Sequence, residues 1–457
     1  MNATRDLNPV NIHRLFLAAT MVLAAPPLAA QQLTLAGALA RAETTAYANR
    51  TATSGVAAER ARTLGTLQGI VPTVRVESGV ATTTDPLGAF AFALRQRTVT
   101  AAAFSPAAIN DPSARSNWSA AVVAEMPLLN ADAWAGRNAA LAGSRATAAG
   151  ADWTRVQTRL QVVQAYYSAR LASELVLTIG AAAATAEARV HEVRARHEQG
   201  LVTRSDLLLA QLRAGEIDAQ LIGARAEVQL TRQELARVLG TPRDTVFSLP
   251  DSLPSPEHIR VLAGVLAAAP FRCPADVAAA QATSDAAARD LMRATTRLLP
   301  RLNSFARYDW NDHAAPFRGN GSWTLGVLAT WTPFSGFAEV SDMRGAHARA
   351  SAANTMLEAV EAEAALRRAA SERAVTVALA RLAIAEQAVD QGSEAHRLVA
   401  RQYAGGLAGI TELLGAQAIE TQTRLGLAQA RVALIIAITA RQLARGSDPA
   451  AIAALER

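Results

Sequence analysis

The sequence predicts a mostly α-helical protein with a small β part, built as a tandem repeat. Two long windows contain no proline, one between Pro127 and Pro242 and one between Pro333 and Pro449. Before each window, apolar and polar residues alternate as they do in a β-strand. A glycine site divides each window into a longer and a shorter helical arm. The same order of elements therefore occurs twice.

The composition favours long packed helices over a compact enzyme. Of the 457 residues, 51% are hydrophobic but only 5% are aromatic, and much of the apolar half is alanine, which adds little bulk to a core. All 45 basic residues are arginine, which excludes Schiff-base chemistry and a phosphate-binding loop lysine. The single cysteine, Cys273, excludes an intramolecular disulfide. We therefore expect no enzymatic activity.

Charge and histidine spacing give no sign of other ligands. The formal net charge of +6 comes from arginines scattered between Glu, Asp and Ala, so no basic run indicates nucleic-acid binding. His191 and His197 do not share a helical face, and no HExxH motif occurs. We expect no nucleic-acid partner, no cofactor and no metal site.

Residues 1–30 have the pattern of a secretory signal peptide. Arg14 precedes the apolar run 15–23, and small residues end at Ala30, where we expect cleavage. Further along, the longest apolar runs, such as 432–440, are far shorter than the ~20 residues that a spanning helix needs. The sequence predicts an exported protein that is not held by a transmembrane helix.

The two repeats are offset by 206 residues, the difference between the opening prolines at 333 and 127. At this offset Gly200-Leu201 aligns with Gly406-Leu407, and Asp206 aligns with Glu412. The expected division is signal peptide 1–30, first repeat 31–242, linker 243–270, second repeat 271–448 and C-terminal tail 449–457. Within the repeats we expect β-hairpins at about 72–127 and 300–333, and helical hairpins at 128–241 and 334–448.

The helical arms have the pattern of coiled coils. Apolar and small residues recur at alternating spacings of four and three from Leu208 and from Leu414 onward. A longer arm of about 65 to 70 residues would measure ~100 Å at 1.5 Å per residue. We interpret Tyr166 and Tyr167 as packing residues of such a seam.

Four strands are expected, and their apolar faces suit a lipid environment. Trp323 and Trp331 share one face and lie ~26 Å apart along a strand, as in the two aromatic girdles of a membrane barrel. Trp118 is placed similarly in the first half, with Glu125 on the opposite face. The alternative is a soluble hairpin whose tryptophans form a local core.

Four strands cannot close a barrel, and lipid does not tolerate open strand edges. The barrel must therefore be shared between copies of the chain. Two copies would give eight strands filled by side chains, and three copies would give twelve strands and a pore.

The order of elements resembles the outer membrane efflux protein family, the TolC-type channel-tunnels. The segments that carry the resemblance are Leu-Thr-Leu at 33–35, the strand ends 126–128 and 332–334, Ala-Tyr-Tyr at 165–167, the turns 197–201 and 403–407, and Val-Leu-Gly at 238–240. The resemblance covers essentially the whole chain after the signal peptide.

The resemblance implies a homotrimer in the outer membrane. Three protomers would combine four transmembrane β-strands each into a barrel that continues into a periplasmic α-barrel of long coiled-coil helices. Such a protein is a passive conduit of a tripartite efflux or secretion system, with a periplasmic adaptor and an inner-membrane pump as partners. The alternative from another class is a periplasmic adaptor or coiled-coil scaffold, which would share the long helices.

The resemblance also implies two kinds of site. The helix-turn tips would dock the adaptor, and they comprise Gly200, Leu201, Val202, Thr203, Gly406, Leu407, Ala408 and Gly409. Asp206 and Glu412 would form an acidic entrance gate. Some members carry a second acid three residues later, where this chain has Leu209 and Gly415. The plainer alternatives are glycines that cap helices and acids that complement a helix dipole.

Overall fold

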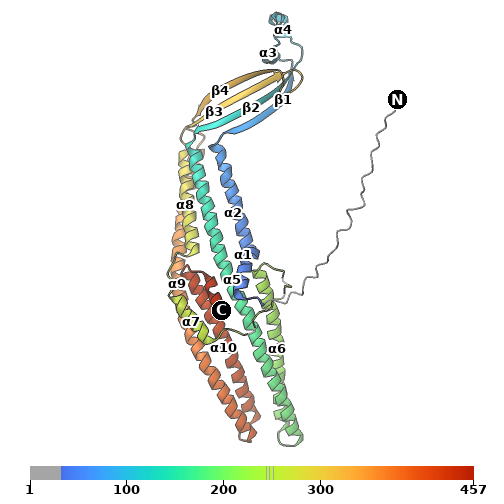
Figure 1. Cartoon of the computed structure of the whole chain (residues 1–457), viewed down its shortest axis with the longest axis vertical. Coiled ribbons are helices and arrows are strands. Elements are labelled where there is room, and N and C mark those ends of the chain that lie inside the picture. The colour runs from blue at the N-terminus through green and yellow to red at the C-terminus, as the bar shows by residue number, and fades with distance from the viewer. Residues whose placement is uncertain (1–31, 243, 246, 251, 457) are drawn as a thin grey trace, which may run out of the picture.

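The chain is elongated, with a small sheet at one end and, at the other, two turns that each connect a pair of helices (Figure 1). The computed structural model describes residues 32–456 except 243, 246 and 251. The expected signal peptide, residues 1–30, lies outside the described residues. The long axis of the molecule follows its longest helices, so the sheet and the turns lie at opposite ends of the same helical body.

Two long helical hairpins form most of this body. The first consists of α5, Ala131–Glu198, and α6, Arg204–Val238. The second consists of α9, Ala338–Ala404, and α10, Ile410–Ala444. The long helices have 68 and 67 residues and the short ones have 35 each, so the two hairpins are close copies in length. The predicted mostly helical fold class is confirmed.

Shorter helices extend the body toward the sheet. Helices α1, Leu35–Thr45, and α2, Tyr47–Gly65, run along α5, and α8, Ala275–Thr296, packs between α5 and α9. A short 3-10 turn, η2, Thr66–Gly69, follows α2. The expected linker 243–270 includes a helix, α7, Pro256–Ala267, whose N-terminus is capped by the Ser255 hydroxyl.

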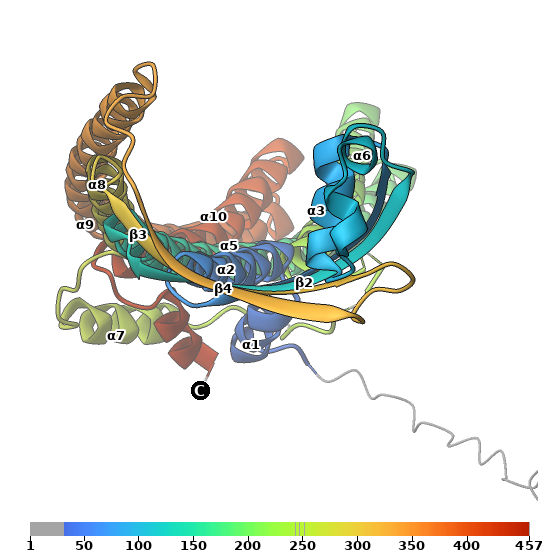
Figure 2. The ribbon, with the colours of Figure 1, turned by 90° about the horizontal axis from the view of Figure 1, so that it is seen from above.

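The four predicted strands form one antiparallel sheet in the order β1-β2-β3-β4. They are β1, Thr73–Thr83, β2, Arg115–Leu129, β3, Arg301–Asp312, and β4, Asn320–Thr330. Each repeat contributes one hairpin, and β2 and β3 pair across the repeats. Viewed from above, the sheet is strongly curved (Figure 2).

The long connection between β1 and β2 is not an irregular loop throughout. It contains α3, Pro86–Arg95, the 3-10 turn η3, Ala101–Phe104, and α4, Pro106–Asn110. Asp85 and Ser105 cap α3 and α4, and each is followed by a proline in the first turn of its helix. These local signals explain why the segment becomes helical.

The main core lies in the middle of the body, where both hairpins meet α1, α7 and the C-terminal 3-10 helix η4, Pro449–Glu456. Tyr166 and Tyr167 of α5 are fully buried, and their rings pack edge to face 5.4 Å apart. The Tyr166 hydroxyl donates a hydrogen bond to the Leu33 carbonyl at 3.1 Å. Ile452 of the expected tail is also fully buried, so this segment belongs to the core.

Two helices are apolar enough over 18 residues to cross a membrane by length and composition, α5 and α10. This differs from the expectation that no such stretch follows the signal peptide. In the fold, however, both helices belong to the packed body, and Val162, Ile435 and Ile438 are fully buried there. Alanine raises the hydropathy of these helices, and only part of each apolar window is buried, 22% in α5 and 39% in α10.

Replacing Tyr166 with alanine should destabilise the helical body by about 3–5 kcal/mol, because it leaves a cavity and removes the hydrogen bond to Leu33. The measurement is detergent-solubilised thermal unfolding followed by circular dichroism. Leu177, which is 61% exposed on the same helix, provides a control as Leu177→Ala. Equal midpoints for the two variants would contradict the assignment of Tyr166 to the core.

Candidate pore surface and helix-turn tips

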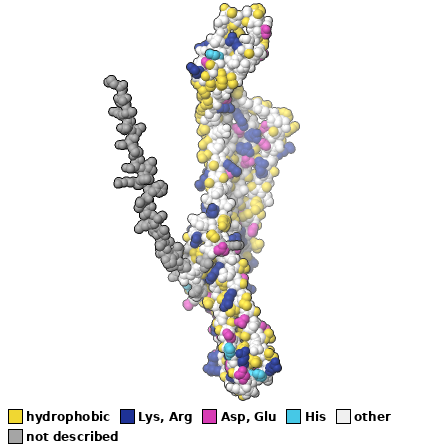
Figure 3. Space-filling view, turned by 90° about the vertical axis from the view of Figure 1, so that its right-hand side faces the viewer, with side chains coloured by type: hydrophobic (Ala, Val, Ile, Leu, Met, Phe, Trp, Pro, Cys, Tyr) yellow, Lys and Arg dark blue, Asp and Glu magenta, His cyan; other side chains and the backbone are white. Residues whose placement is uncertain are grey.

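The sheet has one apolar face that extends across all four strands. The pairing register places directly opposite residues on the same face. One such row consists of Val76, Val122, Tyr308 and Trp323. The next row on this face consists of Val74, Ala124, Ala306 and Leu325. Hydrophobic side chains gather over the sheet in the space-filling view, whereas charged ones spread over the helical body (Figure 3).

The opposite face of the sheet is polar and carries a chain of ion pairs. Arg75 contacts Glu125 at 2.8 Å and Glu77 at 3.2 Å. Arg307 contacts Glu77 at 3.0 Å and Asp309 at 2.8 Å. These pairs are partly exposed, so they add little stability, but they keep charge on one face of the sheet. Glu125 therefore lies on the face opposite the tryptophans, as the sequence predicts.

The three predicted girdle tryptophans lie at the two ends of the sheet. Trp118 and Trp323 are near the α3 end, and Trp323 is 73% exposed. Trp331 follows β4 at the end near the helical body, where its indole donates to the Leu298 carbonyl at 3.2 Å.

The sheet has two exposed edges. Within the described chain, β1 and β4 pair with a strand on one side only.

The two helix-turn tips have the same backbone hydrogen bonds. Gly200 and Gly406 adopt φ values of 75° and 76°, which glycine tolerates best. The Leu201 amide donates to the Arg196 carbonyl at 2.9 Å, and the Leu407 amide donates to the Gln402 carbonyl at 2.8 Å. This is the Schellman arrangement that ends helices at a glycine. The glycines therefore do cap helices, as the plainer interpretation holds.

Capping does not account for the leucines that follow. Leu201 is 70% exposed and Leu407 is 84% exposed, and both project at the far end of the body. Val202 and Ala408 are half-buried and pack on a cluster between the two hairpins. The exposed apolar part of the tips is thus the leucine pair, with Thr203 and Gly409 beginning the returning helices.

Asp206 and Glu412 each take part in the N-terminal cap of a helix. The Asp206 carboxylate accepts hydrogen bonds from the Thr203 amide at 3.0 Å and from the Thr203 hydroxyl at 2.7 Å. The Glu412 carboxylate accepts from the Gly409 amide at 3.2 Å. Both acids therefore have the helix-start role, and neither is buried. This role places each carboxylate close to the tip.

A tyrosine joins the two hairpins just behind the tips. Tyr403 of α9 is 6% exposed, and the guanidinium groups of Arg196 and Arg189 from α5 lie 4.9 and 5.8 Å from its ring centre. Glu192 pairs with both arginines. Burial raises the pKa of the Tyr403 hydroxyl, and the two arginines oppose that shift. Nothing in the sequence pattern alone pairs Tyr403 with α5.

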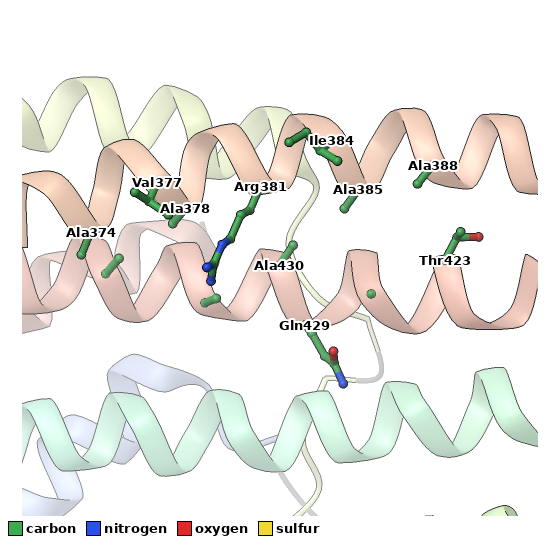
Figure 4. A pocket seen from close by; sticks show the side chains of 13 residues that line it. Ala374, Val377, Ala378, Arg381, Ile384, Ala385, Ala388, Thr423, Gln429 and Ala430 are labelled. Atoms are coloured by element: carbon green, nitrogen blue, oxygen red, sulfur yellow. The ribbon is translucent and has the colours of Figure 1, made fainter. Parts of the chain in front are cut away.

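A groove along the helical body carries no set of catalytic groups. It lies between α9 and α10 and is lined mainly by small residues, with Arg381 its one charged lining side chain (Figure 4). Among the described residues, no group of three His, Cys, Asp or Glu side chains could hold a metal ion. The groove thus presents small apolar side chains from both helices.

Comparisons with known proteins agree with this geometry. Residues 274–445 match the family model described as outer membrane efflux protein. These residues form an outer membrane efflux protein domain. The domain contains α8, β3, β4 and the whole second helical hairpin, up to the end of α10. No curated protein sequence gives a match.

The fold outside the outer membrane efflux protein domain is also found in solved structures. The outer membrane protein VceC from Vibrio cholerae aligns with 92% of this chain and 97% of its own, at 19% identity and a TM-score of 0.74. The Campylobacter jejuni CmeC outer membrane channel aligns over 90% and 85%, at 13% identity and a TM-score of 0.74. The open state of the Neisseria gonorrhoeae MtrE outer membrane channel aligns over 91% and 89%, at 17% identity and a TM-score of 0.72.

Several aromatic residues join Trp331 at the body end of the sheet, although the strand pattern did not assign them to a girdle. Trp134 lies in the first turn of α5 and is 56% exposed, while Phe334 and Phe337 precede α9 and pack edge to face 5.3 Å apart. They lie outside the alternating strand pattern, so strand periodicity could not find them. Their position within four residues of a strand end or helix start was the available signal.

Proposed function

We propose that the chain is the outer-membrane channel subunit of a tripartite efflux or secretion system. Three copies would form a passive conduit from the periplasm across the outer membrane. The observation that carries this proposal is the sheet, which has an apolar face, a charged face and two unpaired edges. The likeness to solved outer membrane channels over nine-tenths of the chain supports the same assignment.

The sheet fits a shared barrel better than a local soluble core. In lipid every backbone N–H and C=O group needs a partner, so the free edges of β1 and β4 would pair with β4 and β1 of neighbouring copies. The apolar face, with its tryptophans, would then meet lipid, and the charged face would line an aqueous pore. Three copies of a four-stranded sheet would give twelve strands, enough for a pore.

The helical body supplies the periplasmic part of the conduit. At ~1.5 Å per residue, the 68 residues of α5 extend ~100 Å. The groove of small residues between α9 and α10 allows close approach of a helix from the next copy. A periplasmic adaptor would contact the tips at Leu201 and Leu407, whose side chains are exposed at the far end of the body.

The alternative, an adaptor or coiled-coil scaffold, explains the long helices but not the sheet. A scaffold has no use for a sheet with apolar and charged faces at the end of its helices. We infer that the conduit carries solutes delivered by an inner-membrane pump, with Asp206 and Glu412 forming an acidic ring at the periplasmic entrance.

Light scattering of the detergent-solubilised protein tests the shared barrel directly. We expect a trimer that forms ion-conducting channels in planar lipid bilayers, because only strands from several copies can satisfy the sheet edges. A folded monomer with the native helical content would rule out the shared barrel. A trimer that conducts no ions would retain the assembly but contradict the conduit.

Replacing Leu201 and Leu407 with aspartate should abolish export while leaving the trimer intact, since both side chains are exposed. Loss of an apolar contact at the centre of an interface costs on the order of 2–4 kcal/mol of binding. Accumulation of a dye exported by the partner pump measures the loss in cells. Val261→Asp, on the exposed side of α7, is the control. Loss of the trimer together with export would place the leucines in the fold instead.

Neutralising the two acids separates their charge from their capping role. Asp206→Asn with Glu412→Gln retains an oxygen that can accept the cap hydrogen bond but removes the charge. We expect single channels of this double variant to lose much of their cation preference. Asp218→Asn, exposed on the same helix as Asp206, is the matched control. Unchanged selectivity in the double variant would leave both acids as helix caps alone.

A further inference from the structure

Helix α3 lies on the concave side of the curved sheet, beyond the end that faces away from the helical body (Figures 1 and 2). It belongs to the connection between β1 and β2, which the sequence predicts as a long loop. A surface loop of this kind is usually exposed and weakly attached. This one is attached to three different strands.

The attachment is a buried chain of amides on the polar face of the sheet. The Gln96 side-chain amide donates to the Asn117 side-chain oxygen at 2.9 Å and to the Ser116 carbonyl at 2.8 Å. Asn117 in turn donates to the Asn311 side-chain oxygen at 2.8 Å. Gln96, Asn117 and Asn311 are 7%, 3% and 5% exposed. Buried amides are costly unless they are paired, so this chain holds the end of α3 against β2, and Asn117 links that point to β3.

Two further hydrogen bonds tie the same point to β4. The Asn320 side chain donates to the Gln96 carbonyl at 2.8 Å, and Arg97 donates to the Gly321 carbonyl at 3.2 Å. Arg97 has a φ of 54°, a left-handed conformation that is unfavourable for a residue with a side chain. The surrounding contacts hold Arg97 in this conformation, so the turn after α3 has a defined structure.

The two faces of α3 differ in size and exposure. Ala89 and Ala93, one turn apart, are buried, with exposures of 1% and 2%. Leu87 and Leu94 are seven residues apart, so they share a face of the helix, and this face is opposite to that of the two alanines. Leu87 is 77% exposed and Leu94 is 52% exposed. Phe104, packed edge to face against Phe90 at 5.7 Å, adds a further exposed ring.

We propose that α3 forms an apolar constriction at the outer mouth of the pore. Asn117 and Asn311 lie on the charged face of the sheet, which lines the pore under the proposed function, and the inference rests on that function. Three copies would bring three α3 helices over the same opening, with Leu87 and Leu94 toward the water-filled space. Apolar constrictions limit passage by excluding water, so the chain selects against large polar solutes entering from outside.

Thiol labelling of intact cells tests this placement without depending on the periplasmic entrance. A reporter, Thr324→Cys, stands on the polar face of β4 below α3, where Thr324 is opposite Arg307. Cys273 is exposed and is first replaced with serine. The probes are a small maleimide and a maleimide carrying a long polyethylene glycol chain. Ala314→Cys, in the exposed β3–β4 connection outside the constriction, is the matched reporter control.

With α3 intact, the small probe should label Thr324→Cys and the large probe should not, whereas both should label Ala314→Cys. Adding Leu87→Ser and Leu94→Ser should raise the labelling rate of Thr324→Cys by the large probe about tenfold. A rate that stays unchanged, or rapid labelling by the large probe before the leucines are replaced, would overturn the constriction. Gln96→Leu, which removes the amide anchor but keeps the leucines, should also raise this rate, and an unchanged rate there would show that the amide chain does not position α3.

The proposed function can fail separately. If the small probe also fails to reach Thr324→Cys in either background while Ala314→Cys reacts, the polar face does not line an open pore. That outcome would contradict the conduit itself and the constriction with it.

Discussion

The backbone hydrogen bonds of the outer strands impose the constraint on which the rest of the molecule depends. In the described chain, β1 and β4 each leave one edge without a strand partner, and such an edge presents N–H and C=O groups with which another strand can pair. The alternation of side chains makes the constraint stricter, because one face is apolar and the other is charged. A register shift of one residue would exchange these faces. The pairing between β2 and β3 therefore fixes how the two repeats can act together.

The helical body connects the sheet to the two tips over a long distance. Each repeat places its helical hairpin directly after its second strand, so the position of a strand in the sheet determines the position of a tip far away. The matching helix lengths and the matching glycine turns keep the two tips level. Tyr403 and its two arginines then join the hairpins near that level, and the large core around Tyr166 joins them further up. These two clusters thus join the hairpins at different positions along the body.

Two groups of charged side chains have defined positions in the fold. Ion pairs occupy one face of the sheet, and acids stand at both helix starts next to the tips. Asp206 and Glu412 cap their helices, and under the proposed function they would also face the entrance of the conduit. At the opposite end, α3 exposes the leucines Leu87 and Leu94. The two ends of the proposed conduit would therefore act on solutes by different physical means.

Features that depend on neighbouring residues could be predicted from the sequence. Alternation around Trp323 predicted a strand and its apolar face, the absence of proline predicted helix length, and Gly200 and Gly406 predicted the turns, since period and backbone freedom are local properties. Features that join distant segments became visible in the folded chain alone. Asn117 meets Asn311 across 194 residues, and Tyr403 meets the α5 arginines from the other repeat. The burial of Ile452 and the attachment of α3 likewise depend on which elements pack together. No local pattern records such contacts, because each partner alone is compatible with many positions.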